Sequence, residues 1–283
     1  CNFFMECVAR HSREAYPFLK GYLEQEGLLD KEKSALVDSG WVGSMQKTLN
    51  MVLNKLGREE TLTGYYWGLY ELPEDVNREE YFCYYFSPEK GLREKVYFSN
   101  CLFEAIFSAP HGMTMSYRRT EKAYEPCYAV IPAERQRFMQ RLESGLLAFT
   151  GNTIKEIKNI EEIDCVKYRD TIKKIFRLFM GYPTEEEGEI FGKLEFSDDV
   201  LDEKQQEVAA ELNEAELCAN HVWNKALVML GFRNMYVKES AWYEGSVARF
   251  GKRRGYHLFM YRLYKYLLYI RKNYYYRKTR RKK

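Results

Sequence analysis

A short stretch of glycine, serine and acid between an apolar segment and a helical pattern has the composition of an anion-binding loop. The apolar residues Ala35–Val37 predict a buried strand that ends in an acid, Asp38. Gly40 and Gly43 let the backbone turn tightly and approach a ligand, and Ser44 stands at the expected N-cap of the following helix. The free N–H groups and positive dipole end of that helix would point back into the loop, which favours phosphate binding.

Three side chains of this stretch suit the same phosphorylated ligand. Asp38 would hold a pair of sugar hydroxyls or a Mg²⁺ ion that bridges phosphates. Gln46, one turn into the helix, would orient the same group, and Trp41 offers a flat face to a sugar or base. The alternative is a plain strand–helix connection in which Ser44 only caps the helix and Trp41 only packs. The sequence contains neither a Walker lysine nor a Gly-x-Gly-x-x-Gly pattern, so the local pattern alone does not decide between the two.

Glu104 and His111 are further candidates in the first half of the chain. Glu104 lies in the apolar stretch Phe-Glu-Ala-Ile-Phe, where a carboxylate needs a partner or a raised pKa. It could act as a general base on an acceptor hydroxyl, or form a buried salt bridge with Arg118 or Arg119. His111, in a Pro-His-Gly loop, could reach a phosphate or sugar oxygen, or simply be solvated. The two arginines could clamp a pyrophosphate or pair with acidic residues at the surface.

An aromatic and acidic group nearer the end of the chain could bind a sugar. Trp242 would provide the stacking surface, and Glu244 would accept hydrogen bonds from sugar hydroxyls. The alternative is a turn anchored by a buried Trp242. If Glu104 and Glu244 both face the loop that follows Asp38, their convergence would support catalysis.

The composition is that of a globular chain without a disulfide framework. The 283 residues are 46% hydrophobic and 30% charged, which excludes a disordered protein. The seven cysteines show no Cys-x-x-Cys spacing, so they predict reduced thiols and neither disulfides nor a zinc site. The one metal ion that the sequence suggests is Mg²⁺, bound together with a phosphorylated donor. No apolar run approaches the roughly eighteen residues needed to span a membrane.

Hydrophobic periodicity predicts more helix than strand, with strand–loop–helix units in the first half. The expected fold class is therefore α/β: helix-rich, with a Rossmann-like strand–loop–helix core and a helical C-terminal extension. Two domains are predicted, an α/β catalytic or ligand-binding domain at 1–250 and a basic amphipathic helix and tail at 251–283. Beyond the unit at 35–56, the predicted strands include 61–70 and 81–86, and the predicted helices include 96–107, 133–149, 217–230 and 255–272.

The C-terminal segment is strongly basic. Thirteen of the 44 Lys and Arg residues lie between Lys252 and Lys283, a segment without acids, which leaves 31 basic and 41 acidic residues in the rest. The helix predicted at 255–272 places Phe259, Leu263, Leu267 and Ile270 on one side and Arg262, Lys265, Tyr269 and Lys272 on another. This pattern favours contact with an anionic membrane. A core helix with a solvated tail and nucleic-acid binding are the alternatives, and the acidic body argues against nucleic acid as a partner.

The segment Val-Asp-Ser-Gly-Trp-Val-Gly-Ser-Met-Gln at 37–46 resembles a family signature, Asp-x-Gly-Trp-x-Gly-Ser-x-Gln. It is typical of modules that follow HAD-type phosphatase domains in bacterial capsule and lipopolysaccharide biosynthesis proteins. The resemblance extends to segments spread over most of the chain, at 22–28, 68–70, 102–117, 183–192 and 242–248. It implies a HAD phosphatase domain in the same polypeptide, before Cys1. Since the sequence starts at Cys1 without a methionine, we expect it to be a piece of a longer protein.

The resemblance also implies a function among glycosyltransferases, because such proteins act with them. Some two-module proteins of related design look like a phosphoribosyltransferase paired with a phosphatase, although phosphoribosyltransferases of the common fold carry two acids where this chain has only Asp38. The expected activity is transfer of a phosphorylated sugar, in its sharpest form from phosphoribosyl pyrophosphate, to a glycan or lipid-linked glycan. The expected location is the cytoplasm, at the inner face of the plasma membrane. The alternatives are a non-catalytic module that binds a glycan or partner for the phosphatase, and a membrane-docking scaffold.

Overall fold

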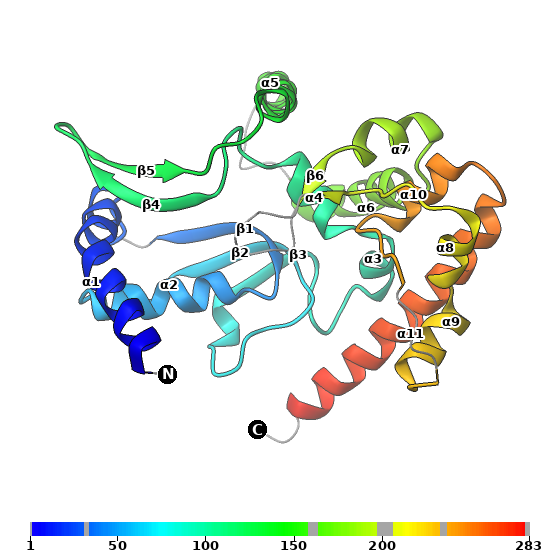
Figure 1. The fold of residues 1–283 in the computed structure, drawn as a ribbon, viewed down its shortest axis with the longest axis horizontal. Helices are drawn as coiled ribbons and strands as arrows, with labels where there is room; N and C mark the ends of the chain where they lie inside the picture. Colours follow the sequence, from blue (N-terminus) through cyan, green and yellow to red (C-terminus); the bar gives the residue numbers. More distant parts are fainter. Residues whose placement is uncertain (1, 31–33, 158–163, 197–205, 233–236, 281–283) are drawn as a thin grey trace.

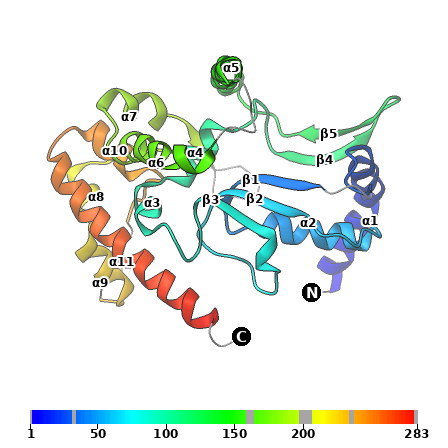
Figure 2. The same ribbon diagram turned by 180° about the vertical axis from the view of Figure 1, so that it is seen from behind.

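The computed structural model describes residues 2–30, 34–157, 164–196, 206–232 and 237–280. The fold is α/β and rich in helix, with a parallel three-stranded sheet and a helical C-terminal region, as the sequence predicts. Figure 1 shows the sheet with helices α1 and α2 in one half of the molecule and helices α6 to α11 gathered in the other half. The view from behind in Figure 2 shows the same division.

The sheet contains three parallel strands in the order β1-β2-β3, namely β1 (Ala35–Trp41), β2 (Thr63–Leu69) and β3 (Tyr81–Phe86). Helix α2 (Ser44–Lys55) connects β1 to β2 and gives the predicted strand–loop–helix unit. The connection from β2 to β3 contains only the short 3-10 turn Arg78–Glu80. The core is therefore one β-α-β unit with an additional parallel strand.

Strand β1 differs from its prediction in length and burial. It was expected to be buried and to end at Asp38, but it continues through Trp41, and it is an edge strand on which Val37 is 83% exposed. The glycines explain the extra length: Gly40 has φ 108° and pairs with Gly68, and a Cβ on Gly40 would lie 1.7 Å from the Gly68 carbonyl oxygen. A side chain at position 40 would therefore collide with the backbone of β2, so this part of the pairing requires glycine.

Two short helices replace the single helix predicted at 96–107. Helix α3 (Leu92–Tyr97) ends before Ser99, and α4 (Asn100–Ile106) begins after it. The Ser99 hydroxyl accepts a hydrogen bond from the Leu102 amide at 3.3 Å, which caps α4. This break turns α4 toward β1, and α4 thereby carries Glu104 to the sheet.

A β-hairpin and two long helices lie around the sheet. The hairpin is formed by β4 (Thr114–Arg119) and β5 (Tyr124–Tyr128), and it packs against α1 (Asn2–Gln25). Helix α5 (Ala133–Glu156) follows the hairpin and lies apart from the sheet in Figures 1 and 2. Within the hairpin, Arg118 pairs with Glu125 at 3.2 Å on the surface, which is the surface pairing given as an alternative, and its carboxylate partner is not Glu104.

The second half of the molecule is mainly helical. The polar segment at 206–214 contributes to the core, because Val208, Ala209 and Leu212 are buried. The helix predicted at 217–230 is two helices. The elements are α6 (Cys165–Gly181), α7 (Glu185–Gly192), β6 (Glu195–Phe196), β7 (Gln206–Glu207), α8 (Glu214–Ala219), α9 (Val222–Met229), α10 (Tyr243–Phe250) and α11 (Arg254–Arg280).

The largest hydrophobic core joins the two halves. It includes Tyr85 and Phe86 from β3, Phe103 from α4, Met180 from α6 and Trp242 beside α10. Burial of aromatic side chains of this size stabilises the fold by about 1.5–3 kcal/mol each. The sheet is therefore held against the helical region by packing from elements far apart in the sequence.

Helix α11 begins close to the predicted position and is longer than predicted. Its first half packs into the protein through Leu258, Arg262 and Lys265, which are all buried. Arg262 and Lys265, predicted to lie on a polar side, are thus in the interior, while the apolar side chains predicted to share one side are exposed to solvent: Phe259, Leu263, Leu267 and Ile270. No helix in the described part of the chain is long and apolar enough to cross a bilayer.

Candidate functional site

A cleft of about 690 Å³ lies where β1, β2 and α4 meet, and it contains both residues predicted to be catalytic. We call it the Asp38–Glu104 cleft. Asp38 comes from β1 and Glu104 from α4. The two residues are 66 positions apart in the sequence, but the two elements are in contact in the fold. The other lining side chains are mostly apolar or aromatic: Leu36, Val37, Ser39, Met45, Tyr65, Tyr66, Trp67, Tyr84, Phe103, Phe107 and Ser108.

The hydroxyl of Ser39 bridges the two carboxylates. Its Oγ lies 3.2 Å from Asp38 Oδ1 and 3.3 Å from Glu104 Oε1. The hydroxyl carries one hydrogen, so it can donate to only one of the two carboxylates at a time. Asp38 Oδ1 also accepts the Gly40 amide at 3.0 Å, which fixes the orientation of that carboxylate on the strand. Sequence reasoning did not identify Ser39 as a site residue, because its role depends on a partner from another element.

The environment of Glu104 raises the pKa of its carboxyl. Desolvation by the surrounding protein is the largest cause and the charge of Asp38 adds to it, while the side chains of Asn100 and Ser39 favour the charged form and oppose the shift. The side chain itself remains exposed at the mouth of the cleft. A carboxyl with a raised pKa that solvent or substrate can still reach is suited to accept a proton.

The front of helix α2 stays open beside this cleft. Gly43 precedes the helix in the left-handed conformation, with φ 73°, so Gly43 and not Ser44 is the N-cap, and no side chain caps the helix. Ser44 and Met45 are exposed, and Met45 lines the cleft. Gly43 itself is buried, and an added Cβ would lie 2.9 Å from the Tyr81 ring, which explains why glycine is needed there. The free amides of the first turn are therefore not covered by a cap.

Gln46 does not lie at the surface, contrary to the predicted role in donor binding. Its side chain is fully buried, and Nε2 donates to the carbonyls of Leu62 at 2.7 Å and Glu80 at 3.2 Å. Its Oε1 accepts the Tyr66 hydroxyl at 2.8 Å. These bonds hold α2 to the segments that precede β2 and β3, so the side chain has a structural role.

A second and larger cavity, of about 930 Å³, lies beyond the carboxyl ends of β1 and β2. We call it the carboxyl-end cavity. Trp41 stands at its rim, 53% exposed, with the unusual φ of 131°. Its ring packs on Tyr70 at 5.6 Å, and Tyr70 stacks on Tyr269 of α11 at 5.5 Å. Ligands of open parallel sheets bind at this edge, and a non-glycine residue held at positive φ is the kind of strain found at functional sites.

Polar side chains from distant elements line the carboxyl-end cavity. Lys265 is buried and lies 3.5 Å from Glu244, and desolvation lowers the pKa of this lysine, against the opposing charge of Glu244. Asn100 is buried near Glu104, and neither polar atom of its amide makes a well-formed hydrogen bond among the described residues. Lys272 pairs with Glu71 at 2.8 Å. Nothing in the sequence indicated Asn100, and Lys265 was assigned to a membrane-facing surface.

Trp242 and Glu244 do not form a sugar-binding surface. Trp242 is fully buried, and its Nε1 donates to the Met180 carbonyl at 2.7 Å. Glu244 is only 3% exposed and is held by Lys265, so it does not face the loop after Asp38. Trp242 is therefore a buried anchor, which was the alternative interpretation of the sequence.

His111 lies in the loop before the hairpin and outside the lining of the Asp38–Glu104 cleft. Its ring stacks on Tyr128 at 3.8 Å, and Nδ1 is 2.8 Å from the Gly112 carbonyl oxygen. The structure therefore does not bring His111 together with Asp38 and Glu104.

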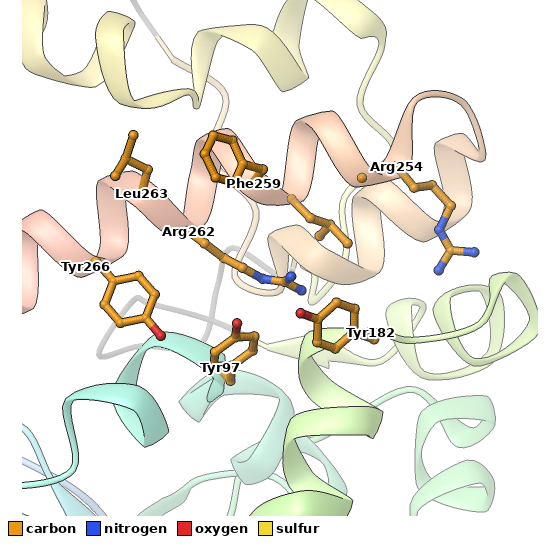
Figure 3. A pocket seen from close by; sticks show the side chains of 9 residues that line it. Tyr97, Tyr182, Arg254, Phe259, Arg262, Leu263 and Tyr266 are labelled. Atoms are coloured by element: carbon orange, nitrogen blue, oxygen red, sulfur yellow. The ribbon is translucent and has the colours of Figure 1, made fainter.

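A third cavity, of about 560 Å³, is lined by aromatic, apolar and arginine side chains between α11 and α3. Figure 3 shows Arg262 extending from α11 toward Tyr97 and Tyr182. The guanidinium lies 4.0 Å from the Tyr182 ring centre and 4.8 Å from that of Tyr97, and it donates to the Gly181 carbonyl. Among the described residues this buried arginine has no carboxylate partner, and its Nε has no hydrogen-bond partner. Leu263 and Phe259 connect the cavity to the exposed apolar side of α11.

No known protein family matches the chain, and a comparison with curated proteins finds no match.

Proposed function

We propose that the chain is a glycosyltransferase-type enzyme of bacterial surface polysaccharide biosynthesis that uses a phosphorylated sugar donor. In its most specific form, the proposal names phosphoribosyl pyrophosphate as that donor. The observation that carries the proposal is the pair Asp38 and Glu104, joined by the Ser39 hydroxyl beside the uncapped front of α2. This arrangement supplies a proton acceptor and a second carboxylate in one cleft, with free backbone amides beside it.

Each group would act at a different part of the reacting complex. Amides of the first turn of α2 would hold the donor phosphates and stabilise the leaving pyrophosphate. Asp38 would position the donor hydroxyls, or hold Mg²⁺ together with the phosphates, since Mg²⁺ is usually bound through one or two carboxylates and phosphate oxygens. In the transfer, the bond from the sugar C1 to pyrophosphate breaks, the acceptor oxygen bonds to C1, and Glu104 takes the acceptor proton.

Several features support an acceptor at a membrane surface. The apolar residues Phe259 and Leu263 are exposed on α11, in the C-terminal segment that carries thirteen basic residues and no acid. An anionic lipid surface offers the complementary chemistry. A lipid-linked glycan at the inner face of the plasma membrane, with a HAD phosphatase in the same polypeptide, completes the proposal, and nucleic acid is not a proposed partner.

The direct test is transfer of labelled ribose phosphate by the full chain. The protein is incubated with phosphoribosyl pyrophosphate, Mg²⁺ and a lipid-linked glycan, and both pyrophosphate release and labelled glycan are measured. Asp38→Ala and Glu104→Gln should each lower the rate at least 100-fold, the smaller effects of lost acid–base groups being about that size. The matched control Glu134→Gln, on the exposed face of α5, should leave the rate unchanged. Absence of transfer by the unaltered chain would count against the proposal.

A non-catalytic glycan-binding module is the second candidate, and the exposed and strained Trp41 at the carboxyl-end cavity favours it. In that case Trp41→Ala abolishes glycan retention while Asp38→Ala leaves it intact.

The proposed contact between α11 and an anionic membrane is tested by flotation with anionic and neutral vesicles. Leu263→Ser should reduce binding to anionic vesicles, whereas Phe149→Ser, at an apolar position on α5 that is even more exposed, should not. Equal loss in both variants would contradict a role for α11.

A further inference from the structure

Cys218, His221 and His257 form a cluster of metal-ligating side chains outside the cavities described above. Cys218 lies in the last turn of α8, His221 stands immediately before α9, and His257 lies in the first half of α11. One potential ligand atom from each residue lies within 4.8 Å of the other two. Figure 1 shows these three helices beside one another at the edge of the helical half.

The distance between the histidines fits a shared ion. His221 Nε2 and His257 Nδ1 are 3.0 Å apart. Two nitrogens bound to one zinc at about 2.0–2.1 Å with tetrahedral geometry are about 3.3 Å apart. The rings would therefore need to separate by only a few tenths of an ångström to accept the ion. The thiol of Cys218 lies on the same side, close enough to be the third ligand.

Burial distinguishes this cluster from solvated histidines. His221 is 4% exposed and His257 is fully buried, while Cys218 is partly exposed and gives access from solvent. As the pair stands, His257 Nε2 is buried without a hydrogen-bond partner. A zinc ion would bind through His257 Nδ1, the nitrogen that faces His221, and would replace the hydrogen bond between the two rings; Nε2 is not the ligand atom.

We propose that Cys218, His221 and His257 bind a zinc ion that joins α8, α9 and α11. Thiolate and imidazole together are the donors that zinc prefers, and hard cations such as Mg²⁺ bind such a set poorly. The three protein ligands leave one tetrahedral position for water or a further donor. The sequence contains the short-range half of the motif as Cys-x-x-His, but the third ligand lies 36 residues further on, and only the fold brings it close.

The site is tested with the full chain after its affinity tag has been removed. Zinc content per chain is measured by elemental analysis, and cobalt is then substituted for zinc. Tetrahedral cobalt with one thiolate should give intense visible bands and a near-ultraviolet charge-transfer band. Chelation of the metal should lower the thermal unfolding midpoint, because an ion bound only by the folded state stabilises that state. Absence of zinc and of any cobalt spectrum would overturn the proposal.

Variants separate this site from adventitious binding. Cys218→Ser should remove the charge-transfer band and weaken zinc binding by more than about 100-fold, since loss of even an outer-shell partner weakens it 10–100-fold. Because Cys218 is partly exposed, this variant should still fold. Cys127→Ser, a matched thiol on β5, should leave the spectrum and the affinity unchanged. Zinc binding that survives both Cys218→Ser and His257→Gln would show that the ion is held elsewhere and would refute the assignment.

Discussion

Replacement of Gln46 by leucine should destabilise the fold without acting on any ligand. The side chain is fully buried, and it joins α2 to the carbonyls of Leu62 and Glu80 and to the Tyr66 hydroxyl. Gln46→Leu keeps a similar volume but leaves these three partners buried without their bonds. The free energy of unfolding should therefore fall, and affinity for a phosphorylated sugar should change only through the loss of folded protein.

The size of the effect follows from the bonds that are lost. Each buried polar group left without a partner costs about 1–3 kcal/mol. The Glu80 contact is the longest, at 3.2 Å, and contributes least. Three such groups together give an expected loss of about 3–5 kcal/mol, a large part of the roughly 5–15 kcal/mol that stabilises a typical protein. At about 2 °C per kcal/mol for a chain of this size, the unfolding midpoint should fall by about 6–10 °C.

Equilibrium unfolding in urea measures this loss directly. Gln140→Leu, on the exposed face of α5, is the matched control and should change stability by less than about 0.5 kcal/mol. Gly64→Ala provides a second perturbation of the same contact, because its Cβ would lie 2.1 Å from Gln46 Oε1. If Gln46→Leu loses less than about 1 kcal/mol while donor binding disappears, the structural role argued here is wrong and the predicted ligand role is right.

Three further substitutions test other parts of the structure. The raised pKa of Glu104 means that the folded state holds this proton more tightly than the unfolded state does. The free energy of unfolding should therefore fall as pH rises above the ordinary glutamate pKa of 4.5. In Glu104→Gln, urea titrations at several pH values should not show this decrease. Trp242→Phe removes the bond to the Met180 carbonyl and should lower stability by about 1–3 kcal/mol in thermal unfolding, with glycan binding unaltered; lost glycan binding at unchanged stability would contradict this. Arg118→Ala removes an exposed ion pair and should change the urea midpoint by less than about 1 kcal/mol, whereas a larger loss would indicate a buried partner.

Elements with a strong local signal could be predicted from the sequence. The aromatic run at Tyr81–Phe86 is β3, and the helical spacing after Ser44 is α2. The splits between α3 and α4 and between α8 and α9 could not be predicted by periodicity, because apolar residues of two short consecutive helices fit one helical repeat almost as well. The split between α3 and α4 is caused by the N-cap at Ser99, which the hydrophobic pattern does not reveal.

The residues of the candidate site could also be predicted only in part. Asp38 and Glu104 were predicted separately from their local surroundings, and the fold places them in one cleft. The roles of Gln46 and Trp242 depend on partners in other elements, so a residue type suited to ligand binding could not be distinguished from a buried anchor. The same limit explains why Asn100 was missed: its position at the carboxyl-end cavity follows from the turn between α3 and α4.

Helix α11 imposes an order on how the protein can acquire its structure during synthesis. Its Lys272 pairs with Glu71, 201 residues earlier, and its Asn273 accepts a hydrogen bond from the buried Lys95, 178 residues earlier. These contacts cannot form until the ribosome has released residues up to Asn273. Until then, α11 cannot cover the carboxyl end of the sheet. Such long-range closure is slow and leaves apolar surface exposed in the meantime. The surface that α11 covers in the folded chain should therefore stay exposed until Asn273 has been synthesised.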